Sequence, residues 1–203
     1  MPASATWVST PNKTDNLKSG YTTKVLFNYQ YTSGTTVGTN QEIFDKIINS
    51  FGKQFRGSNT LPADYFDKFS DGRGFRIVMY FERPFDGNDL DIQTGIYDLT
   101  NATGYTIANQ QNTYTMVTDT GNSMVRYESY LSFFTDLAGS PDYYISATGA
   151  ILFNCKPGPT TAFMIPHNNY VQLTGGPTCD YRLQLANKGA DIYVHSLMLE
   201  EVR

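Results

Sequence analysis

The stretch Cys179–Leu185, CDYRLQL, alternates strictly between apolar and polar side chains. Successive side chains of a β-strand point to opposite faces of its sheet, so this alternation predicts a strand with one buried face. The inner residues would be Cys179, Tyr181, Leu183 and Leu185, and the outer residues would be Asp180, Arg182 and Gln184. The chain is therefore expected to contain a sheet that is packed on one side.

The same period of two recurs through most of the chain, with turns rich in Gly, Pro and Asn between the runs. Short alternating runs separated by such turns are typical of two packed antiparallel sheets. The absence of a regular helix–strand alternation argues against a parallel α/β fold. Strands are expected at 23–31, 75–82, from 90 to 96, and at 113–118, 124–134, 143–153, 161–165, 170–174, 178–187 and 190–202.

One segment has helical periodicity instead. Its apolar residues recur at the spacing of one helix face, and it is preceded by Thr39 and Glu42 in the positions of a capping box and followed by Gly52 as a stop signal. A helix of about three turns is expected near 42–51, docked on a sheet edge or on the end of the sandwich. Its apolar stripe consists of Ile43, Phe44, Ile47, Ile48 and Phe51.

The 203 residues suit one large all-β domain, because such domains run to roughly 200–250 residues without splitting. We expect an N-terminal arm at 1–22 and a single domain at 23–203 that contains a helix-and-loop insertion at 39–73. Trp7 is the only tryptophan and lies in the arm. It would either cover an open end of the sandwich or anchor the arm in a neighbouring subunit.

The net charge and the N-terminal sequence limit the classes of partner and the cellular location that we expect for this chain. A net charge of -4, a pI of about 5.1 and the lack of any long basic run argue against a nucleic-acid partner. The N-terminus lacks the pattern of a secretory signal and no 18 consecutive residues are apolar, so we expect a chain made in a cytoplasm without membrane insertion. The sequence allows a Cys155–Cys179 disulfide, but Cys179 also suits the buried side of its strand.

Motifs for catalysis or metal binding are lacking. His167 is expected in a loop, and His195 on a strand whose other face carries Ile192, Val194 and Met198. No Gly-x-Ser-x-Gly motif and no zinc-ligand spacing accompanies the histidines. The acidic residues Asp64, Asp67 and Asp71 lack the spacing of a calcium loop. We therefore expect no metal and no cofactor.

Four glutamates on expected strands deserve comparison with a glycosidase, in which two carboxyl groups face each other across a cleft. Glutamates that alternate with apolar residues usually lie on the solvent-exposed face of a sheet, and this interpretation is preferred. The four residues are Glu82, Glu128, Glu200 and Glu201.

Aromatic residues are more numerous than one core of this size needs: 15 tyrosines and 13 phenylalanines. Several tyrosines fall where a strand face should be polar, including Tyr80, Tyr130 and Tyr144. Tyrosine packs well and tolerates water, so this excess suits a subunit interface or a sugar-stacking surface. Cross-strand pairing on a sheet surface would also account for it.

The order of strands from 74 to 203, with 23–31 as a first strand, resembles the jelly-roll, tumour-necrosis-factor-like heads of viral and phage surface proteins. The 39–73 insertion departs from that pattern. The segments that carry the resemblance are GFRIVMY (74–80), GIYD (95–98), MVRYESYL (124–131), YISATG (144–149), YRLQL (181–185) and IYVHSLMLE (192–200).

The resemblance implies a two-sheet antiparallel jelly roll, trimers, receptor or capsid contacts, and no catalysis. The expected function is a non-enzymatic virion protein at the particle surface: a minor capsid, decoration, spike or fibre-head protein. Its expected partners are copies of itself in a homotrimer, other capsid or tail proteins, and a host-surface glycan or receptor. Trp7, Tyr193 and His195 are the candidates for the subunit contact. The alternatives are a carbohydrate-binding β-sandwich adhesin and a small jelly-roll glycosidase.

Overall fold

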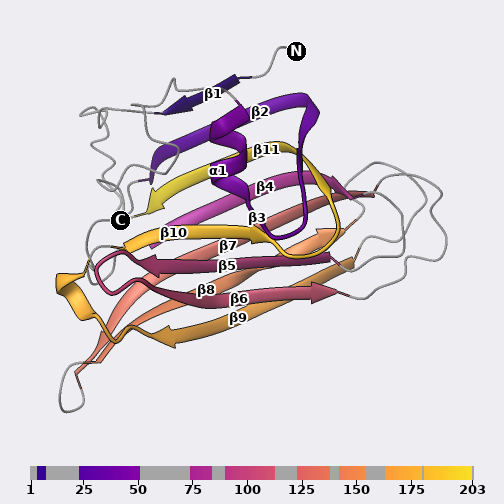
Figure 1. Cartoon of the computed structure of the whole chain (residues 1–203). Coiled ribbons are helices and arrows are strands. Elements are labelled where there is room, and N and C mark those ends of the chain that lie inside the picture. The colour runs from indigo at the N-terminus through magenta and orange to yellow at the C-terminus, as the bar shows by residue number, and fades with distance from the viewer. Residues whose placement is uncertain are drawn as a thin grey trace.

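The computed structural model describes residues 4–7, 23–50, 74–83, 90–112, 123–137, 142–153, 163–179 and 181–202. These residues form two antiparallel sheets that face each other, with one short α-helix and one turn of 3₁₀ helix, η2 (Gly176–Thr178), in the described part (Figure 1). The two-sheet antiparallel sandwich predicted from the alternating pattern is confirmed.

The seven-stranded sheet has the order β1-β2-β11-β4-β7-β8-β9 and the four-stranded sheet has the order β3-β10-β5-β6. The seven strands are β1 (Ser4–Trp7), β2 (Thr23–Val37), β4 (Gly74–Arg83), β7 (Ser123–Asp136), β8 (Asp142–Phe153), β9 (Phe163–Gln172) and β11 (Ile192–Val202). The four strands are β3 (Gln41–Glu42), β5 (Leu90–Asp98), β6 (Thr103–Asn112) and β10 (Tyr181–Asn187).

The chain crosses repeatedly between the two sheets, which gives the jelly-roll arrangement. The pairs β2–β11, β4–β11, β3–β10 and β5–β10 join segments that are distant in sequence, whereas β5–β6 and β7–β8 are consecutive strands. The arm adds β1 to one edge of the seven-stranded sheet, and the β8–β9 hairpin extends the other edge. Strand β6 of the other sheet covers the β8–β9 side, where the Asn169 Nδ2 donates to the Ile107 carbonyl oxygen at 2.7 Å.

The core lies between the two sheets and follows the predicted alternation. On β10, the side chains of Tyr181 and Leu185 are fully buried and Leu183 is nearly so, whereas Arg182 and Gln184 are half-buried on the other face. The expected register of this strand is thus confirmed. Asp180, expected on the outer face, lies outside the described residues.

Helix α1 (Ile43–Ser50) packs against β2 and β10 (Figure 1). Phe44 is fully buried, and its ring meets that of Phe27 edge-on with centroids 6.0 Å apart. The expected docking of the helix is confirmed, but the expected capping box is wrong. The helix starts directly after Glu42, whose Oε2 accepts a hydrogen bond from the Asp45 amide at 2.6 Å, so Glu42 rather than Thr39 is the cap.

Two strand assignments fail for identifiable reasons. Strand β6 was not expected, because its sequence is polar and contains a single buried aliphatic residue among those described, Ile107. The separate strands expected at 161–165 and 170–174 form the continuous strand β9, with Pro166 near its middle. Proline is tolerated there because β9 is an edge strand. The strand expected at 113–118 lies outside the described residues.

A bulge in β11 changes which residues face the core. The pairing of β11 with both neighbours shifts between Val194 and Ser196. Beyond the shift, Leu197 and Leu199 are buried and Met198 points outward. The expectation that Met198 shares a face with Val194 is therefore wrong, because one extra residue reverses the alternation.

Cys179 is a free thiol, nearly fully buried, and its Sγ donates to the Gly175 carbonyl oxygen at 3.1 Å. Its expected position as a small buried residue is confirmed. Cys155 lies outside the described residues, as do the acidic residues Asp64, Asp67 and Asp71 and the helix stop at Gly52.

Candidate docking face

The candidate site is the outer face of the seven-stranded sheet, the side turned away from the four-stranded sheet. Register aligns side chains across five strands in one row: Glu200 on β11, Arg76 on β4, Tyr130 on β7, Thr148 on β8 and Asn168 on β9. Further rows lie on either side of this one at the two-residue repeat of a strand. The face is therefore an ordered array of side chains from distant parts of the chain.

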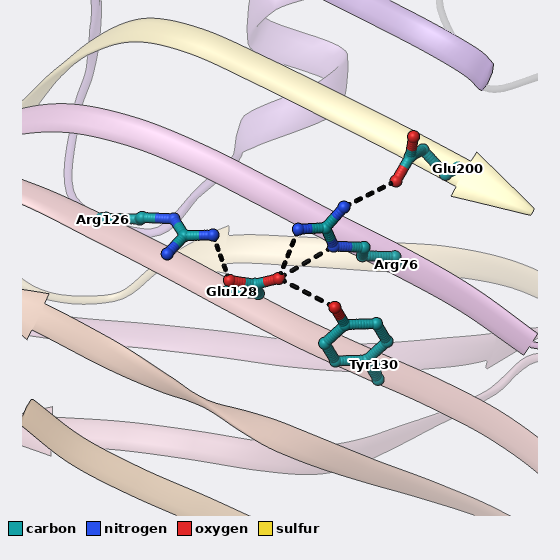
Figure 2. Close-up of polar contacts among 5 residues, drawn as sticks. All are labelled: Arg76, Arg126, Glu128, Tyr130 and Glu200. Atoms are coloured by element: carbon teal, nitrogen blue, oxygen red, sulfur yellow. Dashed lines mark hydrogen bonds and ion pairs between the residues drawn. The ribbon is translucent and has the colours of Figure 1, made fainter. Parts of the chain in front are cut away.

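A network of ion pairs occupies the centre of this face, and Figure 2 shows it extending over β4, β7 and β11. Arg76 links two carboxylates: its Nη2 lies 2.7 Å from Glu128 Oε1, and its Nη1 lies 3.1 Å from Glu200 Oε2. Arg126 pairs with the other oxygen of Glu128. Two arginines and two glutamates thus balance their charges within the face.

The surroundings of Glu128 fix its charge. Burial alone would raise its pKa, but hydrogen bonds from Arg76 and Tyr130, with the charges of Arg126 and Arg76, hold the pKa below its ordinary value. Glu128 therefore stays ionised at neutral pH. A glycosidase pair needs one carboxyl group that remains protonated, and Glu128 and Glu200 instead share one arginine.

Two tyrosines flank the network, one beside each arginine. The Arg76 guanidinium lies 5.5 Å from the centroid of the Tyr130 ring, and that of Arg126 lies 5.8 Å from the centroid of Tyr80. Both are within the range of cation–π attraction. Tyr130 is 45% exposed and Tyr80 is 36% exposed, so each ring still presents apolar surface to solvent.

A second aromatic group lies towards one end of the face. The rings of Phe134 and Tyr144 stack with centroids 5.2 Å apart, and Tyr170 meets Tyr144 edge-on at 5.9 Å. These three residues come from β7, β8 and β9, and we call them the aromatic ladder. Tyr170 is 64% exposed, and Met164, elsewhere on β9, is 60% exposed. A single face thus carries most of the large exposed apolar residues of the described chain.

The structure places two of the three candidate contact residues on this outer face. Tyr193 pairs across strands with Glu82, and His195 lies at the bulge, where its Nδ1 is 2.9 Å from the Thr32 carbonyl oxygen and its Nε2 is 3.6 Å from Glu82 Oε1. Both residues are half-buried, so other residues supply most of the exposed apolar surface. Trp7 lies on β1 with its backbone opposite Phe27.

Sequence reasoning overlooked the arginines and the β7–β9 ladder. The available signal was the spacing Arg126, Glu128, Tyr130 and Phe134, which places complementary and aromatic side chains on one face of a single strand. The tyrosines singled out for falling on a polar face, Tyr80, Tyr130 and Tyr144, do belong to the face. Arg76 could not be joined to Glu128 without the register of β4 on β7.

His167 corrects another expectation, because it lies on β9 and points into the sandwich rather than forming part of a loop. Its ring stacks on Tyr127 at 5.7 Å, and its Nε2 is 3.1 Å from the Ser129 Oγ. Burial lowers the pKa of His167. Ser129 is fully buried, so this serine–histidine contact does not present a nucleophile to a substrate.

Within the residues that the structure describes, no group of three or more His, Cys, Asp or Glu side chains is placed to hold a metal ion. No helix in that part of the chain is long and apolar enough to cross a membrane. Comparisons with protein families, with curated proteins and with solved structures find no match to this chain. The residues of the outer face therefore carry the functional argument.

Proposed function

We propose that this protein is a non-enzymatic structural module that acts by self-association through the outer face of its seven-stranded sheet. The observation that carries the proposal is the aromatic ladder beside a charge-balanced ion-pair network on that face. Exposed apolar groups of this size are typical of contact surfaces, and aromatic residues and arginine are enriched in them.

A second copy of the chain is the occupant that the charges favour. The whole chain carries a net charge of -4, so two copies repel each other at long range. The two arginines of the network cancel the two glutamates, so a contact centred there brings no excess of like charge together. Since the network already satisfies much of its own hydrogen bonding, covering it leaves few unpaired charges.

The biological setting follows from the resemblance of the strand order to viral and phage heads. We propose a homotrimer at the surface of a virion, as a minor capsid, decoration, spike or fibre-head protein, made in the host cytoplasm. Other capsid or tail proteins and a host-surface glycan or receptor are its proposed partners. Purified particles that contain this chain in multiples of three would support this placement, and particles that lack it would refute it.

Sedimentation velocity tests the self-association. The wild-type chain should sediment as a closed oligomer, a trimer under the proposal, and Tyr170→Asp should sediment largely as a monomer because it places a charge in the ladder. Leu99→Asp is the matched control: Leu99 is 44% exposed in the turn after β5, away from the docking face. A monomeric wild type, or equal dissociation by both variants, would contradict the proposal.

Hydrolysis assays test the absence of catalysis. Because Glu128 and Glu200 are both bound to Arg76, we expect no release of reducing sugar from oligosaccharides. Turnover that is abolished by Glu128→Gln and retained in a matched Glu82→Gln variant would refute the non-enzymatic role.

A further inference from the structure

The outer face of the four-stranded sheet carries a hollow of about 220 Å³ that the docking face does not involve. We call it the amide groove, and it is lined by polar side chains from the turn before β3 and from β10, β5 and β6. The polar residues in its lining are Asn40, Glu42, Gln93, Thr106, Gln184 and Lys188.

The pairing of β5 with β10 explains why there is a hollow. Gln184 lies opposite Gly95, and Gln93 lies opposite Ala186, so each long side chain has a small partner across the strands. Gly95 cannot be replaced by a larger residue, because β6 passes so close that a Cβ there would lie 2.5 Å from the Tyr105 carbonyl oxygen. Two glutamines therefore border a space that their cross-strand partners leave open.

The Glu42 carboxyl group in the lining accepts hydrogen bonds from the Asp45 and Leu185 amides, but the amide and ammonium groups differ from it. Among the described residues, the side chains of Asn40, Gln93, Gln184 and Lys188 make no hydrogen bond or ion pair, in contrast to the linked arginines and glutamates of the docking face. Each amide presents both a donor and an acceptor. Three amides and one ammonium group around one hollow form a set of convergent groups of the kind that orients a small ligand.

The charge of the groove restricts the class of ligand. Lys188 is the only cationic residue among the described residues of its lining. Burial raises the pKa of Glu42, at the wall, to about 8, so at pH 7 this carboxyl group is largely uncharged. Phosphate sites use several cationic groups or clustered backbone amides, and the groove has neither. Neutral hydroxyl groups match paired amide donors and acceptors better.

We propose that the amide groove binds a single neutral sugar residue, with the amides of Gln93 and Gln184 hydrogen-bonded to adjacent hydroxyl groups of the ring. The volume is below the roughly 300–1,000 Å³ of pockets for drug-sized ligands, which suits one ring rather than a chain of them. The described lining contains no aromatic residue, so hydrogen bonds rather than stacking hold the sugar. The affinity is therefore weak, on the order of millimolar.

Saturation-transfer NMR on the full chain tests this site with D-glucose, D-galactose and N-acetyl-D-glucosamine as separate probes. At least one probe should receive saturation from the protein and give a millimolar Kd. Gln184→Leu, which keeps the side-chain size but removes the amide, should weaken binding about tenfold. Ala186→Leu should abolish binding by filling the hollow. Gln30→Leu, on the exposed part of β2, is the matched control and should bind as the wild type does.

Three outcomes would overturn the proposal: no saturation of any probe, equal binding by Gln184→Leu and the wild type, or displacement of the sugar by millimolar inorganic phosphate. Lys188→Ala changes an exposed side chain and provides a further groove variant should the others fold poorly. It is expected to weaken binding as well. Sedimentation of each variant separates this site from the docking face, because groove variants should leave the oligomer unchanged.

Discussion

The two outer faces of the sandwich differ in how their polar groups are satisfied. On the seven-stranded sheet, Arg76 and Arg126 are bound to Glu128 and Glu200, and the surrounding aromatic rings remain exposed. On the four-stranded sheet, the side-chain amides of Gln93 and Gln184 make no hydrogen bond within the part of the chain that the structure describes, and they border a hollow.

This difference indicates what each face can bind. Buried polar groups cost free energy unless they are hydrogen-bonded, so a face that already satisfies its charges can be covered by another protein surface. Amides without partners need water or a ligand that replaces it. Under the two proposals, the same alternation of outward side chains gives a protein-contact surface on one sheet and a small-ligand groove on the other.

The largest expected effect concerns the packed inner faces, on which both outer faces depend. Leu183→Asp should unfold the domain, because an unpaired carboxylate in the core costs several kcal/mol, on the order of the whole stability of a domain. Gln184→Asp is the matched control on the next residue of β10, facing outward, and should change stability by less than about 1 kcal/mol. Urea unfolding checks both, and equal midpoints would show that the register of β10 is wrong.

The ion pairs of the two sheets should differ in how much they contribute to the free energy of unfolding, and this difference is of intermediate size. Arg76→Ala leaves two partly buried carboxylates without their shared partner and should reduce the free energy of unfolding by about 1–2 kcal/mol. Arg182→Ala, on the four-stranded sheet, removes only a 3.9 Å contact with Asp45 of helix α1 and should cost less than about 0.5 kcal/mol. Equal losses for the two variants in urea unfolding would contradict the distinction.

The smallest expected effect is a pH dependence of stability that arises from His167, which is buried between the two sheets. Its pKa is lowered from 6.5 by burial, so the unfolded chain takes up a proton more readily than the folded chain. Stability is therefore full above about pH 6.5 and falls as the pH drops through the folded-state pKa. His167→Gln should lose this contribution between pH 7 and pH 5. The raised pKa of Glu42 stabilises the fold as the pH falls over this range, but it acts in both proteins and cancels in the comparison.

Urea midpoints of the wild type and His167→Gln at pH 7 and pH 5 measure the effect. Glu128 does not contribute in this range, because its lowered pKa makes its stabilisation decline only below about pH 4.5. Equal changes of the midpoint in the two proteins between pH 7 and pH 5 would show that His167 does not contribute to the pH dependence.

Much of the fold could be predicted from the sequence because inner residues are apolar wherever a strand has one buried face. The inward residues of β10 and the helix at Ile43–Ser50 follow directly from period and turn signals. The bulge at His195 could not be predicted, since no residue there is diagnostic and one extra residue reverses the face of Met198. Strand β6 was missed because its described sequence is largely polar.

The candidate site was less predictable than the fold. The excess of tyrosines indicated a contact surface, and Tyr80 and Tyr130 were correctly singled out as outward aromatic residues. Their arrangement depends on register: Arg76 lies 52 residues from Glu128 in sequence and 124 from Glu200. The amide groove likewise depends on small residues lying opposite glutamines, which only the pairing of β5 with β10 reveals.

Hydroxyl-radical footprinting tests most directly whether a second copy of the chain covers the outer face of the seven-stranded sheet. Oxidation of Tyr130, Phe134 and Met164 should be at least several-fold slower in the assembled wild-type chain than in the dissociated Tyr170→Asp variant, because a second copy covers these exposed groups. Oxidation of Leu99, away from the docking face, should be the same in both proteins. Equal oxidation of the three outer-face residues in the two proteins, or protection confined to Leu99, would contradict the account.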